Sequence, residues 1–200
     1  MIKALQNSLG VISDDPHELK AMVQDYYKSL YTYEGTHNMD VVLDTVPVKV
    51  SMEMNELLCA PYTKDKVKAA LFQMFPTKSP GPDGFPAHFF QRHWDLLQED
   101  IVLAVLDFLN GGELPVGMND TSITLIPKVK HPQFISQYRP IALCPVLYKI
   151  ASKAITNRLR GIMDEIISEE QSAFFPSRLI TDNVLVAYES VHTMKRRKKG

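Results

Sequence analysis

Two cations, Lys128 and Arg139, have the residue types and the spacing that a phosphate-binding site requires. Lys128 follows the β-branched run at residues 121–126, and Arg139 lies at the start of a second apolar run at residues 138–143. If the two runs pair as antiparallel strands, both cations lie at the same end of a rigid ribbon. A guanidinium binds phosphate oxygens bidentately and an ammonium acts as a point charge, so the pair suits a triphosphate. An ordinary exposed hairpin with surface charges is the alternative interpretation.

A second motif, KSPGPDG at residues 78–84, concentrates turn-forming residues around a single lysine. Its composition predicts a stiff loop with exposed backbone amides, and such a loop could cradle phosphates. The motif lacks the Gly-to-Lys spacing of a P-loop. A connector between two helices is therefore the alternative.

The acidic, histidine and cysteine residues do not form a pattern typical of a catalytic or metal site. The adjacent acidic pairs, Asp14-Asp15, Asp164-Glu165 and Glu169-Glu170, fit helix capping or an exposed face, and none follows a predicted buried strand. The six histidines lack ligand spacing. Cys59 and Cys144 lie among apolar residues, which favours reduced thiols over a disulfide or a zinc site. We therefore assign no catalytic and no metal-binding residue from the sequence.

The elements that must position these groups are mostly helical, so the sequence predicts an α+β fold with one short antiparallel hairpin. Residues 36–50 show no clear period and are expected to form a loosely ordered connector. Helices are predicted from Pro16 to near Tyr33, from Thr63 to Phe75, from Ala87 to Asn110 with a possible break near Gln98, from Val146 to Ile167, and from Thr181 toward Lys195.

The net charge of −1 conceals a strong asymmetry along the chain. Residues 1–119 carry 9 basic and 16 acidic side chains, a balance of −7, whereas residues 120–200 carry 13 and 7, a balance of +6. Clustered cations release counterions from a phosphate backbone, so the second part could hold a polyanion, with a solvated basic face as the alternative. The sequence shows neither a signal peptide nor a membrane-spanning run, which predicts a soluble, intracellular protein of the nucleus or cytoplasm.

Four runs, in this order, resemble the reverse transcriptases of plant LINE-type (non-LTR) retrotransposons. The runs are KSPGPDGFPAHFFQRHW, TLIPKV, QYRPIALCPVLYKIASKAITNRL and ISEEQSAFFPSRLITDNVL, and the resemblance extends from about Met52 to the last residue. It implies a mostly helical fingers subdomain and the start of a right-hand polymerase palm. The implied activity is RNA-directed DNA polymerisation, a nucleotidyl transfer that uses Mg²⁺ in the full-length enzymes.

The resemblance also implies roles for individual residues. Lys128 and Arg139 match the positions that hold the triphosphate of the incoming dNTP. The residues matched to template binding are Pro80, Gly81, Pro82, Asp83 and Gly84 in the fingers extension, and Gln171, Phe174 and Arg178 near the nascent pair. Two positions depart from the pattern: Gln137 stands where the family usually has an acidic residue, and Ser177 stands where it usually has glycine.

The resemblance further divides the chain into a helical N-terminal extension and connector, residues 1–50, and a partial reverse transcriptase domain, residues 51–200. The metal-binding aspartates of the family have no counterpart here, so we expect a fragment that is inactive alone and has no cofactor of its own. In the full-length enzyme it would bind RNA template, DNA primer and dNTP, without a membrane. A non-catalytic nucleic-acid-binding remnant is the alternative, and the sequence indicates no oligomeric state.

Overall fold

The computed structural model describes residues 2–7, 10–35, 39–169, 171, 172, 175 and 178–197. The chain divides into two compact units, one of residues 1–47 and 61–155 and the other of residues 48–60 and 156–200. These units do not test the division at residue 50 into an N-terminal extension and a partial reverse transcriptase domain, which stays a prediction.

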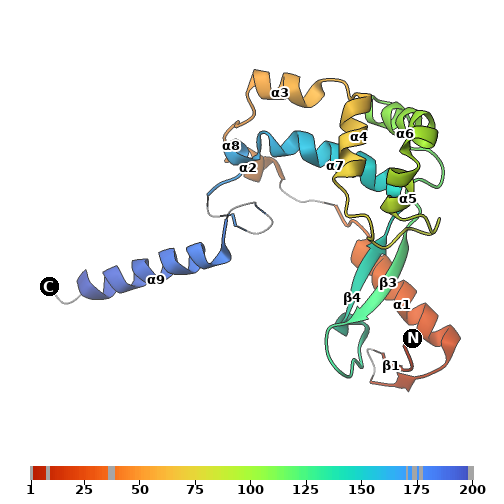
Figure 1. The fold of residues 1–200 in the computed structure, drawn as a ribbon. Helices are drawn as coiled ribbons and strands as arrows, with labels where there is room; N and C mark the ends of the chain where they lie inside the picture. The colour runs from red at the N-terminus through yellow and green to blue at the C-terminus, as the bar shows by residue number, and fades with distance from the viewer. Residues whose placement is uncertain are drawn as a thin grey trace. The chain divides into compact units, whose positions relative to one another are not determined.

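Helices dominate the described residues and two small antiparallel hairpins complete them, which confirms the predicted α+β class (Figure 1). The helices are α1 Pro16–Tyr31, α2 Met39–Leu43, α3 Met52–Cys59, α4 Lys64–Phe72, α5 Ala87–Arg92, α6 Trp94–Leu109, α7 Val146–Arg160, α8 Met163–Ile166 and α9 Ile180–Arg197. The strands are β1 Leu5–Gln6 with β2 Ile12–Ser13, and β3 Ser122–Pro127 with β4 Tyr138–Leu143; the 3-10 helix η1 is Ile135–Gln137.

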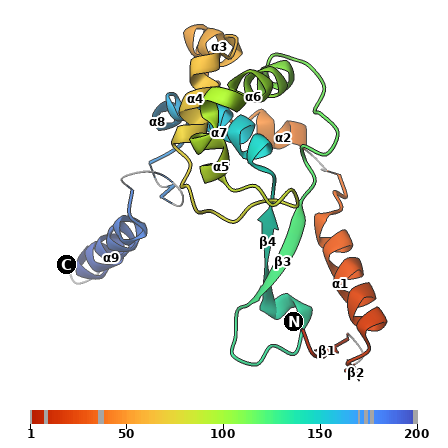
Figure 2. The same cartoon turned by 45° about the vertical axis from the view of Figure 1, so that its right-hand side comes forward.

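The core of the first unit lies where α4, α5, α6 and α7 meet. Its buried side chains recur at helical spacing, because each helix turns one apolar stripe inward. They are Val67, Ala70 and Leu71 of α4, Ala87 of α5, Trp94, Ile101 and Val105 of α6, Val146, Ile150, Ala151 and Ala154 of α7, and Met118. The β3–β4 hairpin extends away from these helices, and α1 runs beside it (Figure 2).

Two predicted helices are interrupted in the structure. The break in the helix predicted from Ala87 to Asn110 lies at His93 rather than near Gln98, because His93 leaves helical geometry with φ −103° and ψ 25°. The helix predicted from Val146 to Ile167 stops at Arg160 and resumes as α8 after Gly161. The sequence signal for both was one continuous apolar period, which does not reveal a local change of backbone direction.

Two short α-helices, α2 and α3, were not predicted. Residues 36–50, expected to be loosely ordered, include α2. The second unit contains α3, whose first turn is capped by Ser51: its hydroxyl accepts a hydrogen bond from the Met54 amide at 3.2 Å.

A hydrogen bond from the backbone amide of Glu53, together with one from the Ser51 side chain, lowers the pKa of the Glu53 carboxyl.

Candidate nucleotide and nucleic-acid interface

The β3–β4 hairpin has the predicted antiparallel pairing. Ile126 lies opposite Arg139 and Pro127 lies opposite Tyr138. Tyr138 is buried, whereas Arg139 is exposed, because successive side chains of a strand point to opposite faces. The pairing therefore leaves the guanidinium of Arg139 on the exposed face of the ribbon.

Lys128 continues this ladder by one position and lies on the same end of the ribbon. Its backbone amide donates to the carbonyl oxygen of Gln137 at 2.8 Å, so Lys128 and Arg139 occupy diagonal positions on one face. Its ammonium donates to the carbonyl oxygen of Ser136 at 2.7 Å. An ammonium has three N–H donors, and this bond fixes one of them while the others can meet a phosphate.

Gln137 organises the loop of the hairpin. Its side-chain oxygen accepts hydrogen bonds from the backbone amides of Gln133 at 2.7 Å and Phe134 at 3.2 Å. These bonds close the turn that presents Lys128. A carboxylate at this position could accept both bonds, so glutamine in place of the expected acidic residue preserves the acceptor that the loop needs.

The hairpin and α7 form a segment without any negative side chain. Between Asp120 and Asp164 the sequence contains no Asp or Glu but seven Lys or Arg residues. The cations of such a segment create a positive electrostatic potential, because no Asp or Glu nearby in the sequence offsets their charge. Three of these seven cations, Lys128, Lys130 and Arg139, belong to the hairpin and its loop, and the other four belong to α7.

The loop at Pro80 to Gly84 packs closely against the start of α7. A side chain at Gly81 would place its Cβ 2.6 Å from the carbonyl carbon of Cys144 and 2.7 Å from Cα of Pro145. Lys149 donates from its ammonium to the carbonyl oxygen of Ser79 at 2.9 Å. These contacts show that the loop is fixed by packing, which a connector requires, while Pro82, Asp83 and Gly84 stay exposed.

This loop and the two cations lie at opposite ends of the hairpin. Gly81 lies beside Cys144, just past the end of β4, and Arg139 lies five residues earlier along the same strand. At a rise of about 3.4 Å per residue the separation along the strand is about 17 Å. The structure therefore separates the predicted template loop from the predicted triphosphate cations.

The other residues matched to template binding belong to the second unit. The guanidinium of Arg178 donates to the carbonyl oxygens of Ser168 and Gln171, the latter at 3.0 Å, and its central carbon lies 3.8 Å from the centre of the Phe175 ring. Arg178 thus holds its own loop together. Phe174 and Ser177 lie outside the described residues.

The N-terminal segment, which the sequence did not connect to the site, contacts the loop of the hairpin. Leu5 is 1% exposed, and the Gln6 amide donates to the carbonyl oxygen of Gln133 at 2.8 Å. Tyr27 of α1 is buried, and this burial, with the neighbouring Tyr26 and Tyr31, raises the pKa of its hydroxyl. A two-residue strand has too short a pattern to be recognised in a sequence.

Neither a metal site nor a membrane helix is found in the described part of the chain. No three His, Cys, Asp or Glu side chains there are grouped as metal ligands. Within the same residues, every helix is too short or too polar to cross a bilayer.

Comparison with known proteins shows similarity to a transposon protein. The chain is 33% identical over 189 residues to a Xenopus laevis protein described as the Transposon TX1 uncharacterized 149 kDa protein. The alignment covers 94% of this chain and 14% of that protein. No protein-family model matches the chain. The chain is thus homologous to a segment of a transposon protein and spans a small part of that protein's length.

Proposed function

We propose that the chain is the fingers and the start of the palm of an RNA-directed DNA polymerase of the LINE (non-LTR) type, working within a longer retrotransposon protein. The observation that carries this proposal is the diagonal placement of Lys128 and Arg139 on one exposed face of a hairpin. The similarity to a transposon protein over nearly the whole chain supports it. The four sequence motifs supply the polymerase assignment.

In this proposal the hairpin grips the triphosphate of an incoming dNTP. Arg139 binds two phosphate oxygens at once, and Lys128, oriented by the Ser136 carbonyl, neutralises a third. Neutralising the leaving pyrophosphate favours nucleotidyl transfer because negative charge develops there. The resemblance places the Mg²⁺-binding aspartates of the family outside the motifs matched here, so we assign the metal-dependent chemistry to another part of the longer protein.

The template is assigned to two surfaces. One is the exposed edge of the loop formed by Pro82, Asp83 and Gly84. The other is the segment with Gln171 and Arg178, where the Arg178 guanidinium shapes the loop through its bonds to backbone carbonyls. On these surfaces the protein would contact the RNA strand mainly through the shape of its loops and its backbone groups, and less through charged side chains.

A binding experiment separates triphosphate recognition from general affinity for anions. A fluorescent dNTP is titrated into the chain, and dNTP and dNMP are compared as competitors. We expect Arg139→Lys and Lys128→Ala to weaken dNTP binding at least about tenfold, because each removes a charge-assisted hydrogen bond. Lys66→Ala is the matched control, since Lys66 is an exposed cation of α4 in the same unit.

Each outcome discriminates between the candidate functions. Equal competition by dNMP and dNTP, or equal losses in Lys66→Ala and Arg139→Lys, would contradict the triphosphate assignment. RNA binding without any dNTP preference would favour a non-catalytic nucleic-acid-binding remnant, an alternative that the acid-free basic segment also supports. Primer extension by these 200 residues with Mg²⁺ or Mn²⁺ would contradict the assignment of the chemistry to another part of the protein.

A further inference from the structure

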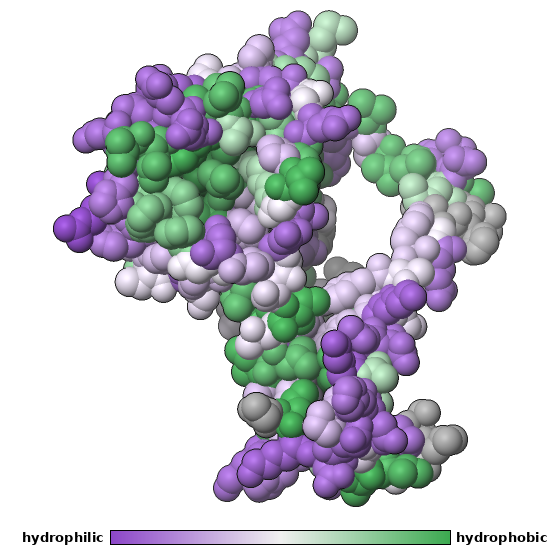
Figure 3. All heavy atoms as spheres, turned by 90° about the vertical axis from the view of Figure 1, so that its right-hand side faces the viewer, coloured by the Kyte–Doolittle hydropathy of each residue, from purple (hydrophilic) through white to green (hydrophobic). Residues whose placement is uncertain are grey.

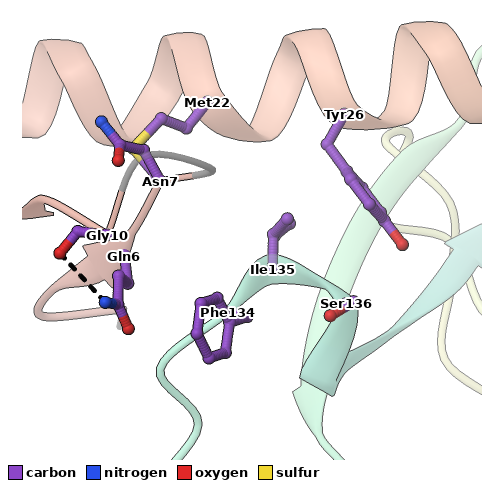
Figure 4. Close-up of a pocket in the computed structure, with 8 residues that line it drawn as sticks. All are labelled: Gln6, Asn7, Gly10, Met22, Tyr26, Phe134, Ile135 and Ser136. Atoms are coloured by element: carbon purple, nitrogen blue, oxygen red, sulfur yellow. Dashed lines mark hydrogen bonds between the residues drawn. The ribbon is translucent and has the colours of Figure 1, made fainter.

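A pocket lies between the N-terminal segment, α1 and the loop of the β3–β4 hairpin (Figure 4). Its volume is about 620 Å³, within the range of roughly 300–1,000 Å³ typical of small-ligand sites. Ile135 points toward α1, with Phe134 to one side of it and Tyr26 to the other (Figure 4). The lining consists of Gln6, Asn7, Gly10, Met22, Tyr26, Phe134, Ile135 and Ser136.

The walls of this pocket are held in place by interactions on both sides. On the N-terminal side, Leu5 is buried, the Gln6 amide bonds to Gln133, and the Gln6 side chain donates to the carbonyl oxygen of Gly10 at 3.0 Å. On the α1 side, buried Tyr27 anchors the helix next to Tyr26. A pocket with fixed walls spares a ligand the cost of ordering them.

The chemistry of the lining suits a flat heterocycle. Phe134 is 39% exposed and Tyr26 is partly buried, so both rings are accessible to a stacking partner. Side chains of Gln6 and Ser136 add donors and acceptors of the kind that reads the edge of a base. Aromatic rings with a few polar groups are typical of sites that hold unpaired bases.

The charges around the pocket indicate on which side a phosphate backbone would run. Ser136 lines the pocket and its carbonyl oxygen accepts the Lys128 ammonium, so that cation lies at the hairpin rim. Lys130 is exposed in the same loop. On α1, the carboxylates of Glu18 and Asp25 offset the cations of Lys20 and Lys28, so this helix has no net positive charge from its Lys, Asp and Glu residues. The hairpin side is therefore the side that favours an anionic strand.

We propose that this pocket binds one unpaired base of a single-stranded nucleic acid, with the adjoining phosphates on Lys130. The inference rests on the proposed function, since it places a strand contact on the same hairpin, beside the triphosphate site whose Lys128 lies at the pocket rim. The base stacks against Phe134 and reaches across Ile135 toward Tyr26 on the other side of the pocket, and the strand leaves along the basic loop. The pocket is thus a point where the N-terminal segment takes part in holding nucleic acid.

The test measures binding of the full chain to an RNA oligonucleotide of roughly twelve nucleotides, to DNA of the same sequence, and to an abasic strand with the same phosphates. The variants Phe134→Leu and Tyr26→Leu remove one ring each, and Phe134→Tyr and Tyr26→Phe retain it. Tyr33→Leu is the control, because Tyr33 is 76% exposed and does not line the pocket. Lys130→Ala removes the phosphate contact.

We expect the abasic strand, and the ring-removing variants with the normal strand, to bind about five- to a hundredfold more weakly. The slope of log K against log salt should stay unchanged in those variants and fall by about 0.7 in Lys130→Ala. A 2-aminopurine base in the strand should lose fluorescence on binding to the unaltered chain, a readout independent of whether a variant folds. Equal affinities for RNA and DNA of the same sequence would support a pocket that contacts only the base. A higher affinity for RNA would support the same pocket with an added contact to the ribose 2′-hydroxyl.

Equal binding of normal and abasic strands, or quenching that survives loss of both rings, would overturn the pocket assignment and leave the proposed function intact. No binding of any strand, with the fold retained, would overturn the pocket assignment together with the proposed strand-binding role. Quenching by free dNTP alone, with no response from the oligonucleotide, would overturn the strand assignment in favour of a nucleotide site.

Discussion

At the scale of single residues, the two glycines of the loop at Pro80 to Gly84 have different physical roles. Gly81 has no room for a Cβ beside Cys144 and Pro145. Gly84 has open space around it but a φ of +75°, a backbone conformation that favours glycine and is tolerated by asparagine. The loop motif is therefore explained by close packing at one glycine and by backbone conformation at the other.

These roles predict different responses to the same substitution. Gly84→Asn should cost less than about 1 kcal/mol of unfolding free energy, because asparagine adopts the left-handed region at low cost. Gly81→Asn should cost roughly 1–3 kcal/mol, because a well-packed backbone must move. Urea unfolding of both variants checks the difference. Equal losses of unfolding free energy in the two variants would show that the loop can move away from Pro145 and make room for a side chain at Gly81.

Gln137 gives a second prediction at this scale. Gln137→Glu should keep the hairpin loop closed, since a carboxylate accepts the same two amides, whereas Gln137→Leu should open it. Hydrogen exchange at the Gln133 and Phe134 amides is the direct measurement. We expect faster exchange and a loss of about 1 kcal/mol in the leucine variant alone. Identical protection in both variants would mean that other contacts close the loop.

At the scale of elements, α3 is fastened to the C-terminal part of α7 within the second unit. The Arg158 guanidinium donates to the carbonyl oxygen of Leu58 at 2.7 Å, near the end of α3, where backbone carbonyls have no helical partner. A cation at a helix C-terminus also interacts favourably with the helix dipole. One long side chain thus connects segments that are 100 residues apart in sequence.

This contact predicts that α3 depends on Arg158. Arg158→Leu should release the segment of residues 48–60, at a cost of about 1.5–3 kcal/mol for a hydrogen bond from a charged donor. Limited proteolysis within that segment, followed by mass spectrometry, checks the release. Arg160→Leu is the matched control, because Arg160 is an exposed arginine of the same helix. If Arg158→Leu left the cleavage pattern unchanged, the apolar residues of α3, and not the Arg158 hydrogen bond, would be what holds the helix in place.

At the scale of the whole molecule, exposed apolar surface is the main feature that the described chain leaves without a partner. Val184, Leu185 and Val186 of α9 are exposed, with 62%, 58% and 65% of each residue accessible. In the first unit, Leu96 and Leu103 of α6 are also exposed. Figure 3 shows a hydrophobic area on the face that it draws. Exposed apolar surface of this kind marks a site of interaction with another molecule or makes a protein prone to aggregate.

We therefore expect the isolated chain to bind a hydrophobic dye and to self-associate. Replacing Val184, Leu185 and Val186 by Thr, Gln and Thr should reduce both effects, because α9 then has fewer apolar side chains in contact with water. Dye fluorescence and sedimentation velocity measure the change. Leu96→Gln with Leu103→Gln distinguishes the contribution of α6 from that of α9. A monomer with no dye binding before any substitution would contradict the prediction.

The sequence by itself determined the features that depend on neighbouring residues. Alternating and helical periods gave the α+β class, the pairing of β3 with β4 and the location of Lys128 and Arg139 at one end of it. The motif order gave the family proposal. Each of these follows from local chemistry repeated along the chain, and so can be recognised without coordinates.

Only the tertiary structure decided the features that depend on segments far apart in sequence. The contact of Gln6 with Gln133, the packing of Gly81 on Pro145 and the bond from Arg158 to Leu58 join residues with no shared periodic pattern. Long-range contacts depend on how complete elements pack, and a single sequence does not encode that packing in any local signal. For this reason the base pocket between the N-terminal segment, α1 and the hairpin could be recognised only in the folded chain.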